Sequence, residues 1–431
     1  MVEKNPEKVY EKPIRVLSKV GFDMATTDEH RYLHFISTQY FSYIGRLEEW
    51  AKINSFSYSL AGLNQMLETL EEAFAPLGAT VSRHELPDQS QLGSDGTVKS
   101  LPLGKALVFE KRPEAPIQIL LAGHMDTVYP PEQEFPVHFY PEEEKMEGPG
   151  VCDMKGGLLI MLIALTALEK FDHSSKIGWK VLINPDEEIG TTGSRALLLE
   201  LAEKCDLALI FEPSLPDGSL VSARKGSARY SVFIKGKSAH VGRNYSEGRH
   251  AIYALGAFII EIENLSKQRE GLIISVGYIE GGGMTNIVPE KAYCQISVRA
   301  DTAEDFQFVD EAIKKLDREF TQTREVAITI SCDSYRPPKP FTKNTEALFD
   351  LFANCAKDLD IPFNLQSTGG VCDGNIIAPI GIPTIDTLGA VGGNLHTSKE
   401  YIDLSSLTQR AQLTTLFLFK LASGELEHKN E

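Results

Sequence analysis

The chain has 431 residues, of which 42% are hydrophobic and 24% are charged, as is typical of a globular protein. This length exceeds what one hydrophobic core usually organises, so two or three domains are expected. The formal net charge of −17 argues against nucleic acid and anionic membranes as partners, although a local arginine could still bind a small anionic substrate.

The cysteines and the N-terminal segment bear on the cellular compartment. No CxxC pair is present, which favours reduced thiols over a disulfide framework or a structural zinc knuckle. The first 30 residues are polar and lack the apolar core of a leader peptide, and no stretch approaches 18 uninterrupted apolar residues. We therefore expect a cytoplasmic protein. The six cysteines are Cys152, Cys205, Cys294, Cys332, Cys355 and Cys372.

The first half of the chain predicts alternating helices and strands. Residues 1–30 have the composition of a weakly structured extension or a short helix. Apolar spacing then predicts a helix over 59–77 and strands over 80–86, 105–110 and 117–122. A helix over 157–170, a strand over 179–184, a helix over 194–204 and a strand over 207–211 follow. This order is typical of a mainly parallel sheet that is covered by helices on both faces.

The pattern changes after residue 218 and returns near the C-terminus. A strand (229–235), a helix (251–265), two strands (272–279, 291–299), a helix (303–320) and a strand (325–330) predict a split ferredoxin-like module. A helix over 345–359, a strand over 383–387 and a helix over 405–421 resume the first pattern. We predict an α/β fold with three parts: an N-terminal extension (1–50), one domain from 51–221 and 336–431, and an inserted α+β domain (222–335).

Acidic and imidazole side chains follow several of the predicted strands. Open α/β proteins bind ligands at the carboxyl ends of their parallel strands, so these side chains are expected to converge. Carboxylates and imidazoles together suit a binuclear metal site. The candidate metal ligands are His124, Asp153, Glu188, Glu212 and His396, and Asp126 and Glu187 lie beside them in the sequence.

Individual roles follow from the chemistry of each residue. Asp153 lies in a glycine-rich loop, and its two oxygens could bridge two ions. Neighbouring residues at a strand end point in opposite directions, so we assign Glu188 to the metal and Glu187 to general base, then general acid. Asp126 could hold the ring of His124 through its second nitrogen. The alternative is that these are turn, capping or solvated acidic residues, although carboxylates massed together without a cation would repel one another.

The donor set also indicates which metal would bind. Five ligands, one of them shared, suit two ions with three protein ligands each. Nitrogen and oxygen donors without thiolate fit zinc best, and cobalt and manganese are the alternatives. Cys152 lies beside Asp153, but we interpret it as a buried thiol.

The inserted domain carries three candidate substrate-binding residues, His240, Asn286 and Arg299. A histidine and an arginine on a separate lid could orient a carbonyl and clamp a carboxylate, for which the arginine fork is well suited. A salt bridge from Arg299 to Asp301 is the alternative.

Together these motifs resemble the co-catalytic zinc aminoacylase/carboxypeptidase superfamily, which includes acetylornithine deacetylase, succinyl-diaminopimelate desuccinylase and, most similar, bacterial glutamate carboxypeptidase. The resemblance covers roughly residues 55–425. It rests on GHMDTV (123–128), GPGVCDMKGG (148–157), NPDEEIGTTGSR (184–195), FEPS (211–214), GKSAHVG (236–242), GGGMTNIVP (281–289), VRAD (298–301), STGGVCDGN (367–375) and NLHTSKEYIDLS (394–405).

The resemblance implies a role for each matching position. His124 and Glu212 would hold one zinc ion, Glu188 and His396 the other, and Asp153 would bridge them, with Glu187 as the base and Asp126 behind His124. A cis peptide between Asp153 and Met154 is also implied. His240 would contact the substrate carbonyl, in its own or a neighbouring subunit's site, and Asn286 and Arg299 would grip the terminal carboxylate. The inserted domain would serve as lid and homodimer surface.

The predicted activity is hydrolysis of an amide next to a free carboxylate. A small peptide or N-acyl amino acid would be the substrate, and a C-terminal residue would be released, as in glutamate carboxypeptidases. The alternatives are an N-acyl-amino-acid deacylase or a dipeptidase with the same site. A catalytically silent relative that only binds is the alternative outside enzymes.

Overall fold

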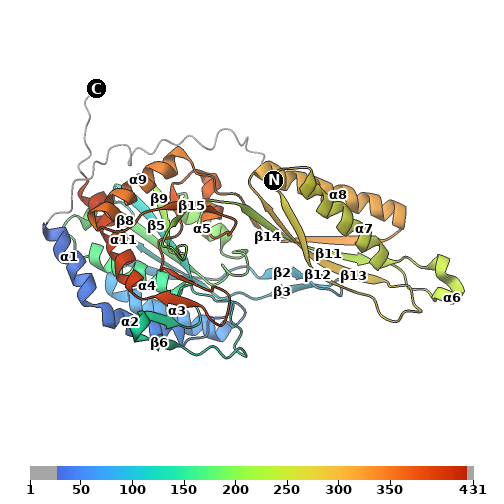
Figure 1. Cartoon of the computed structure of the whole chain (residues 1–431), viewed down its shortest axis with the longest axis horizontal. Helices are drawn as coiled ribbons and strands as arrows, with labels where there is room; N and C mark the ends of the chain where they lie inside the picture. Colours follow the sequence, from blue (N-terminus) through green and yellow to red (C-terminus); the bar gives the residue numbers. More distant parts are fainter. Residues whose placement is uncertain (1–26, 425–431) are drawn as a thin grey trace, which may run out of the picture.

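The computed structural model describes residues 27–424 and consists of two parts arranged along the long axis of the molecule (Figure 1). The larger part, here called the main domain, holds a six-stranded sheet with helices on both faces. The smaller part is a four-stranded antiparallel sheet with two helices on one face. We call this smaller part, residues 226–336, the lid.

The six-stranded sheet of the main domain has the order β1-β4-β8-β5-β9-β16. The strands β8, β5, β9 and β16 run parallel, whereas β4 pairs antiparallel with both β1 and β8. The sheet is therefore mixed: its parallel part runs from β8 to the edge strand β16, and the antiparallel pairings lie on the other side. The strand bounds are β1 (Thr80–His84), β4 (Ala106–Lys111), β5 (Ile117–His124), β8 (Ile177–Asn184), β9 (Leu207–Ile210) and β16 (Thr384–Ile385).

Alternating side chains along each strand build two separate cores. In β5, Ile119 and Leu121 join the core on one face, and Leu120 and Ala122 join the core on the other. The first face is covered by α1 (Thr27–Thr38), α2 (Tyr40–Ala51), α3 (Leu60–Phe74), α4 (Lys155–Leu168), α9 (Lys343–Asp358) and α11 (Ser405–Ser423). The second is covered by α5 (Arg195–Ala202) and α10 (Gly374–Ile377).

The lid sheet has the order β12-β13-β11-β14, as a split ferredoxin-like module requires. Its strands are β11 (Gly226–Lys235), β12 (Ile273–Gly281), β13 (Lys291–Ala300) and β14 (Ala327–Arg336). The helices α7 (Ala251–Asn264) and α8 (Ala303–Arg324) pack on one face with a core of their own. The structure thus confirms the predicted fold class, an α/β sheet with a ferredoxin-like α+β module; the proposed domain boundaries stay a prediction.

The N-terminal part of the chain differs from the expected extension where it is described. The helices α1 and α2 pack on the main core, and Leu33, Ile36, Leu47 and Trp50 are buried in it. The chain from residue 27 is therefore part of the main domain rather than an appendage. The prediction for residues 1–26 lies outside the described residues.

A hairpin that the sequence did not predict joins the main domain to the lid. Its strands β2 (Gln89–Leu92) and β3 (Val98–Leu101) run beneath the helix-free face of the lid sheet (Figure 1). Leu92 packs there with Phe233 and Tyr293, and the Tyr293 hydroxyl donates to the Leu92 carbonyl at 3.2 Å. At the hairpin turn, a side chain at Gly96 would collide with the Phe233 ring. This close approach explains a glycine at that position.

Several short strands also lay outside the sequence predictions. The strands β10 (Leu220–Arg224) and β15 (Leu365–Thr368) pair parallel near the base of the lid. A small sheet of β17 (Gly392–Gly393), β18 (Tyr401–Asp403), β7 (Lys145–Glu147) and β6 (His138–Tyr140) lies beside the main sheet. This small sheet joins the segments that flank Asp153 and His396. Among the described residues, no helix combines the length and apolarity needed to span a bilayer.

Candidate metal centre

The parallel strands at the centre of the main sheet end at one edge, and the predicted ligands follow them. His124 is the last residue of β5 and pairs with Asn184, the last residue of β8. The loop after β8 carries Glu187 and Glu188, and Glu212 follows β9 after one intervening residue. Because the strands are parallel, their carboxyl ends place these side chains together.

The five predicted ligands form two groups of three that share one residue. His124, Asp153 and Glu212 form the first group, and Asp153, Glu188 and His396 form the second. Within each group the candidate ligand atoms lie within 4.8 Å of one another. The structure therefore brings all five predicted ligands together.

Asp153 faces a different histidine with each oxygen. Its Oδ1 lies 3.1 Å from Nε2 of His124, and its Oδ2 lies 3.4 Å from Nε2 of His396. Nε2 of His396 also lies 3.2 Å from Oε2 of Glu188. The geometry is that of a carboxylate shared between two positions. The peptide bond between Asp153 and Met154 is cis, as predicted.

The two positions differ in exposure. The His124 side chain is 1% exposed, whereas that of His396 is 56% exposed. His396 also has a φ of 61°, which is uncommon for a residue other than glycine. One position is thus enclosed by the main domain, and the other opens toward solvent.

Crowding of the carboxylates shifts their protonation. Burial and the charge of Asp153 raise the pKa of Glu188 to about 7. Burial also raises the pKa of Glu212. Burial alone would lower the pKa of His124, but Glu212, Asp126 and Asp153 raise it well above its usual value. These carboxylates would be stabilised in their ionised form by nearby positive charge.

The residues present fit divalent metal ions. Glu212 Oε1 is buried and has no hydrogen-bond partner among residues 27–424, which is costly unless another group binds it. The donors are imidazole nitrogens and carboxylate oxygens, and three converge at each position. The thiol of Cys152 points to the Ala390 carbonyl instead, and burial raises its pKa well above its usual value.

Glu187 diverges from its neighbour Glu188, as the strand-end geometry predicts. Its side chain is 8% exposed, and its Oε1 lies 2.7 Å from Nη2 of Arg336, the last residue of β14 in the lid. The same nitrogen donates to the Glu187 carbonyl at 2.7 Å. Burial raises the pKa of Glu187 well above its usual value despite the nearby arginine.

Asp126 contacts both His124 and the glutamate loop. The carbonyl oxygen of Asp126 lies 3.0 Å from Nδ1 of His124, and its carboxylate lies 3.4 Å from the same atom. The carboxylate accepts hydrogen bonds from the backbone N–H groups of Glu187 and Glu188, both at 3.2 Å. It also accepts one from Ser57 at 2.7 Å. Asp126 thus lies behind His124 as predicted, but its carboxylate mainly fixes the glutamate loop.

The lid residues predicted to bind substrate lie in two different places. His240 precedes α6 (Val241–Asn244), which lies at the end of the lid farthest from the main domain (Figure 1). Asn286 lies beside it, and its carbonyl accepts a hydrogen bond from Val241 at 2.9 Å. The structure of the single chain does not bring this pair to the metal centre.

Arg299 lies nearer to the centre. It pairs across the lid sheet with Ser227, which in turn pairs with Arg336. The two arginines are therefore two strand spacings apart, about 10 Å, on one face. Among the described residues nothing forms an ion pair with Arg299, and its alternative partner Asp301 binds Lys225 instead. Burial lowers the pKa of Arg299, and so do the nearby Arg336 and Arg229.

Several residues at the centre were not identified from the sequence. Arg336 lies at the predicted boundary between the inserted domain and the last segment of the main domain, and we gave it no functional role. Glu400 belongs to a motif that we quoted without giving it a role, although it is fully buried and contacts the Asp153 loop. Proximity to predicted ligands in the sequence was a usable signal for Glu400. For Arg336, no local signal indicated its contact with Glu187.

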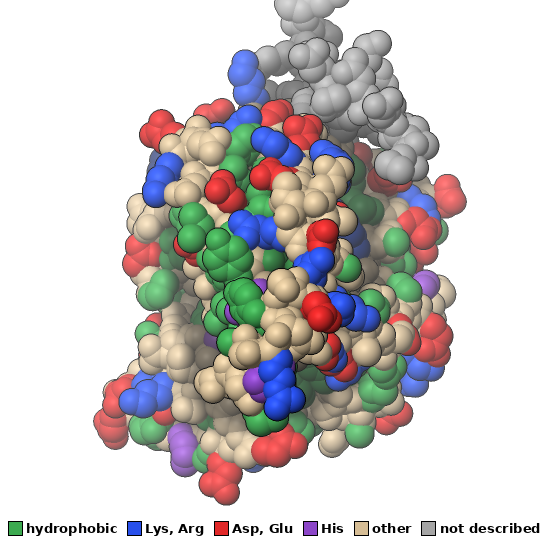
Figure 2. Space-filling model, turned by 90° about the vertical axis from the view of Figure 1, so that its right-hand side faces the viewer, with side chains coloured by type: hydrophobic (Ala, Val, Ile, Leu, Met, Phe, Trp, Pro, Cys, Tyr) green, Lys and Arg blue, Asp and Glu red, His purple; other side chains and the backbone are tan. Residues whose placement is uncertain are grey.

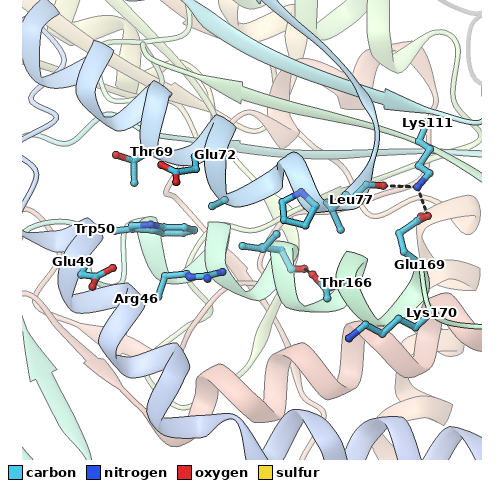
Figure 3. Close-up of a pocket in the computed structure, with 13 residues that line it drawn as sticks. Arg46, Glu49, Trp50, Thr69, Glu72, Leu77, Lys111, Thr166, Glu169 and Lys170 are labelled. Carbon is cyan, nitrogen blue, oxygen red and sulfur yellow. Dashed lines mark hydrogen bonds and ion pairs between the residues drawn. The ribbon is translucent and has the colours of Figure 1, made fainter.

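A separate cavity lies away from the metal centre. It has a volume of about 750 Å³ and is lined by residues of α2, α3 and the C-terminal end of α4 (Figure 3). The metal ligands lie at the opposite end of α4, and 14 residues of helix span about 21 Å. On the cavity wall, Lys111 contacts the Leu77 carbonyl and Glu169 (Figure 3). The cavity is not part of the candidate centre.

Comparisons with known proteins agree with this geometry. The chain matches Peptidase family M20/M25/M40 over residues 120–420. Carboxypeptidase G2 of Pseudomonas sp. (strain RS-16) is 29% identical over 387 residues, which cover 89% of this chain and 90% of that protein. Succinyl-diaminopimelate desuccinylase of Hahella chejuensis (strain KCTC 2396) is 27% identical over 342 residues, which cover 73% of this chain and 85% of that protein.

Solved structures share the fold at lower identity. A tripeptidase from Staphylococcus aureus has a TM-score of 0.69 at 22% identity and covers 88% of this chain and 98% of its own. Human carnosine dipeptidase 1 has a TM-score of 0.65 at 15% identity, and the match covers 92% of this chain and 100% of that protein's chain. The family match spans well over half of the chain and includes all five candidate ligands, so this protein belongs to Peptidase family M20/M25/M40.

Proposed function

We propose that this protein is a metal-dependent hydrolase that cleaves an amide bond next to a free carboxylate and releases a C-terminal amino acid. The single observation that carries the proposal is Asp153, whose two oxygens face His124 and His396 in two ligand groups. The similarity to Carboxypeptidase G2 supports carboxypeptidase activity. The similarity to desuccinylases keeps N-acyl-amino-acid deacylation as the second candidate.

The proposed metal is zinc, with cobalt or manganese as substitutes. His124 and Glu212 would hold one ion, Glu188 and His396 the other, and Asp153 both. When bound, a pair of such ions supplies Lewis acidity that activates water and polarises a carbonyl. The chain provides every ligand from the main domain, so the ion sites do not depend on the lid.

Glu187 is the proposed general base. It lies next to the ligand Glu188, yet its carboxylate contacts Arg336 rather than either histidine. It would accept a proton from the attacking water and pass it to the leaving amine nitrogen as the C–N bond breaks. The products are a carboxylate and a free amino acid, so atoms and charge balance. Arg336 limits the side-chain orientations of Glu187, which favours one geometry for proton transfer.

Arg299 is the proposed binding residue for the substrate carboxylate. Its guanidinium is half-buried and close to two other arginines, and an ionised carboxylate would relieve this repulsion. The N/O donor set and this arginine together favour substrates with a free carboxylate near the scissile amide. A catalytically silent protein would have no need for both features.

The activity is tested with a panel of N-acyl amino acids, dipeptides and tripeptides, incubated with the zinc- or cobalt-loaded protein. Release of a C-terminal amino acid from peptides supports the carboxypeptidase proposal. Cleavage of acyl amino acids alone supports the deacylase. Loss of all cleavage in Glu187→Gln, with ions still bound, assigns the activity to this centre. A loaded protein that cleaves nothing in the panel would contradict the proposed function.

We further propose that two copies associate through the lid. The lid exposes many large apolar side chains on α6, α7 and the edge strand β12, and Figure 2 shows hydrophobic side chains gathered on this end of the molecule. Exposed apolar patches of this kind mark interfaces. The residues are Val241 on α6, Ile252, Tyr253 and Ile260 on α7, Ile273, Tyr278 and Ile279 on β12, and Tyr245 and Met284 in adjacent segments.

Association through this face would give His240 and Asn286 a function. Both lie at the far end of the lid, from which a second copy's metal centre could be reached. Sedimentation of the parent protein is expected to give a dimer, and Tyr253→Glu with Ile260→Glu is expected to give a monomer. Val98→Glu on the hairpin, which is 65% exposed but outside the patch, is the matched control. A monomeric parent protein would refute this association.

A further inference from the structure

Glu400 is a buried carboxylate that lies four residues after His396. It is 0% exposed, and its side chain points into the loop that carries Asp153. It belongs to neither ligand group. A carboxylate buried beside several others is costly unless it is fully hydrogen-bonded, so its contacts require explanation.

All of the hydrogen-bonding capacity of Glu400 is used. Its Oε1 accepts from the backbone N–H groups of Cys152 at 2.8 Å and Asp153 at 2.9 Å. Its Oε2 accepts from the Gly150 N–H at 3.1 Å and from the Tyr129 hydroxyl at 2.7 Å. An ionised carboxylate offers about four lone-pair positions, and here four donors fill them.

The loop of Asp153 is shaped to receive this carboxylate. Gly150 has a φ of 72°, and a side chain there would come within 2.8 Å of Thr127. With this left-handed residue, three N–H groups from one short loop converge on a single side chain, which is a common arrangement for binding an anion. The anion in this structure is a side chain of the same chain.

Backbone contacts join the same three segments. The Glu400 carbonyl accepts from the Gly148 N–H at 3.2 Å, and the Tyr129 hydroxyl lies 3.1 Å from the carbonyl of Thr397, next to His396. Glu400 therefore connects the Asp153 loop to the His396 loop on one side and to Tyr129 on the other. Two ligands of the more exposed metal position come from the loops that it joins.

We propose that Glu400 is a positioning residue that presets the Asp153–Glu188–His396 metal position by holding the Asp153 and His396 loops together. The inference rests on the proposed function, because it concerns the ions of that centre. Glu400 accepts from three backbone N–H groups and the Tyr129 hydroxyl but contacts no side chain of a candidate ligand, so it acts on the position of the ligands. Asp126 has the corresponding contacts with the Glu187–Glu188 loop on the other side of the centre.

The test compares Glu400→Gln and Tyr129→Phe with a control, Asp403→Asn. Glutamine keeps the length of the side chain but turns an amide group toward the loop N–H donors. Phenylalanine removes one donor of the four and is the milder change. Asp403 is a nearby carboxylate whose contacts are with Ser405 rather than with the Asp153 loop, so its variant reports on local stability alone.

Metal affinity is measured by chelator competition, the geometry of the site by the visible absorption of the cobalt-loaded protein, and stability by thermal unfolding in excess chelator. Loss of a partner behind the ligands typically weakens metal binding about 10–100-fold. We expect Glu400→Gln to lower the affinity for one of the two ions by this factor and to change the cobalt spectrum. Tyr129→Phe should change both quantities in the same direction but by less. The control Asp403→Asn should leave the metal affinity and the cobalt spectrum unchanged.

Other outcomes separate this inference from the proposed function. If Glu400→Gln lowers the unfolding temperature but keeps the parent's metal affinity and cobalt spectrum, Glu400 is only structural and the inference fails. A parent protein that binds two ions but cleaves no amide contradicts the proposed function alone. A parent protein that binds no divalent ion contradicts both.

Discussion

The metal centre and the lid hold their candidate residues in opposite ways. At the candidate metal centre, three ligands lie at or after the ends of buried strands and two lie in loops, and Asp126 and Glu400 hydrogen-bond to the loops that carry Glu188 and Asp153. On the lid, by contrast, the Arg299 guanidinium has no ion pair among the described residues. The candidate metal ligands are therefore held in place by the protein itself, whereas the Arg299 guanidinium has no comparable ionic partner among the described residues.

This difference teaches which step each region serves. Chemistry needs groups held within fractions of an ångström, and those are placed on the main sheet. If Arg299 binds the substrate carboxylate as proposed, recognition would use a charge on the lid that has no ion pair among the described residues. Variants in the two regions should therefore change different kinetic or binding constants.

The largest effect is expected from Glu187→Gln. Removing a general base typically costs about 10²–10⁴-fold in rate, because the proton of the attacking water loses its acceptor. We expect kcat to fall by this factor while the metal content, measured by elemental mass spectrometry, stays at the parent value. Retained turnover would show that Glu187 is not the base. The proposed division of roles between Glu187 as base and Glu188 as ligand would then be wrong.

Asp153→Asn should disrupt both ion positions at once. The amide keeps one oxygen but loses the charge that faces the two histidines. The loss of affinity should exceed the roughly 10–100-fold typical of a partner behind the ligands. Glu212→Gln is the matched variant, since it belongs to one group only. Chelator competition that finds one ion unaffected in Asp153→Asn would contradict the shared role.

Arg299→Ala should affect binding rather than the metal. Hydrogen bonds to charged groups contribute about 1.5–3 kcal/mol, so KM for substrates with a free carboxylate should rise about 10–100-fold. Metal content and the cobalt spectrum should not change. Substrates whose carboxylate is converted to an amide should show little difference between variant and parent. An equal loss for both kinds of substrate would argue against a carboxylate clamp.

The smallest effect concerns a fixed ion pair far from both regions. Glu169 accepts two hydrogen bonds from Arg112 and one from Trp179, and it pairs with Lys111. Burial raises the pKa of Glu169, but these partners outweigh it and hold the pKa at about 2, below its usual value of 4.5. The ionised form therefore stabilises the folded state above about pH 4.5, and this contribution is lost as the pH falls toward 2.

Glu169→Gln should accordingly lower the unfolding free energy by roughly 1–2 kcal/mol at pH 7, since solvent screens part of the interaction. The difference from the parent should shrink as the pH falls from 4.5 to 2, as followed by unfolding at several pH values. Turnover at pH 7 and 25 °C should not change. A stability difference that is independent of pH would contradict the depressed pKa.

The convergence of the candidate metal ligands could be predicted because each follows an apolar strand or lies in a glycine-rich loop. Arg336 could not be assigned in this way, since its partner Glu187 lies 149 positions earlier in the chain. Glu400 lies close to His396 in the sequence, but its contact with Cys152, 248 positions away, could not be predicted either. The Arg336 contact depends on how the lid packs against the main domain, and the Glu400 contact depends on how the small sheet packs against it. Local periodicity carries no information on such docking.

The N-terminal helices and the hairpin also differ between the sequence prediction and the structure, for other reasons. The helices α1 and α2 were foreseeable, because apolar residues recur at helical spacing: Leu33 and Ile36 in α1, and Ile44, Leu47 and Trp50 in α2. The polar composition of the first 30 residues led us to group these helices with an extension. The hairpin strands β2 and β3 were not foreseeable, since they are four residues each and mostly polar. Their stability comes from packing against the lid.

That hairpin has a mechanical consequence. The chain crosses between main domain and lid near residues 225 and 337, and two crossings alone define an axis about which a lid can swing. The ion pair of Arg336 with Glu187 and the hydrogen bond from Arg195 to the Tyr335 carbonyl add attachments. The contact of Leu92 with Phe233 and Tyr293 adds another. Any swing must slide or release this contact, at a cost of about 1.5–3 kcal/mol if one leucine side chain becomes exposed. The hairpin contact therefore adds an energetic cost to any change in the angle between the lid and the main domain.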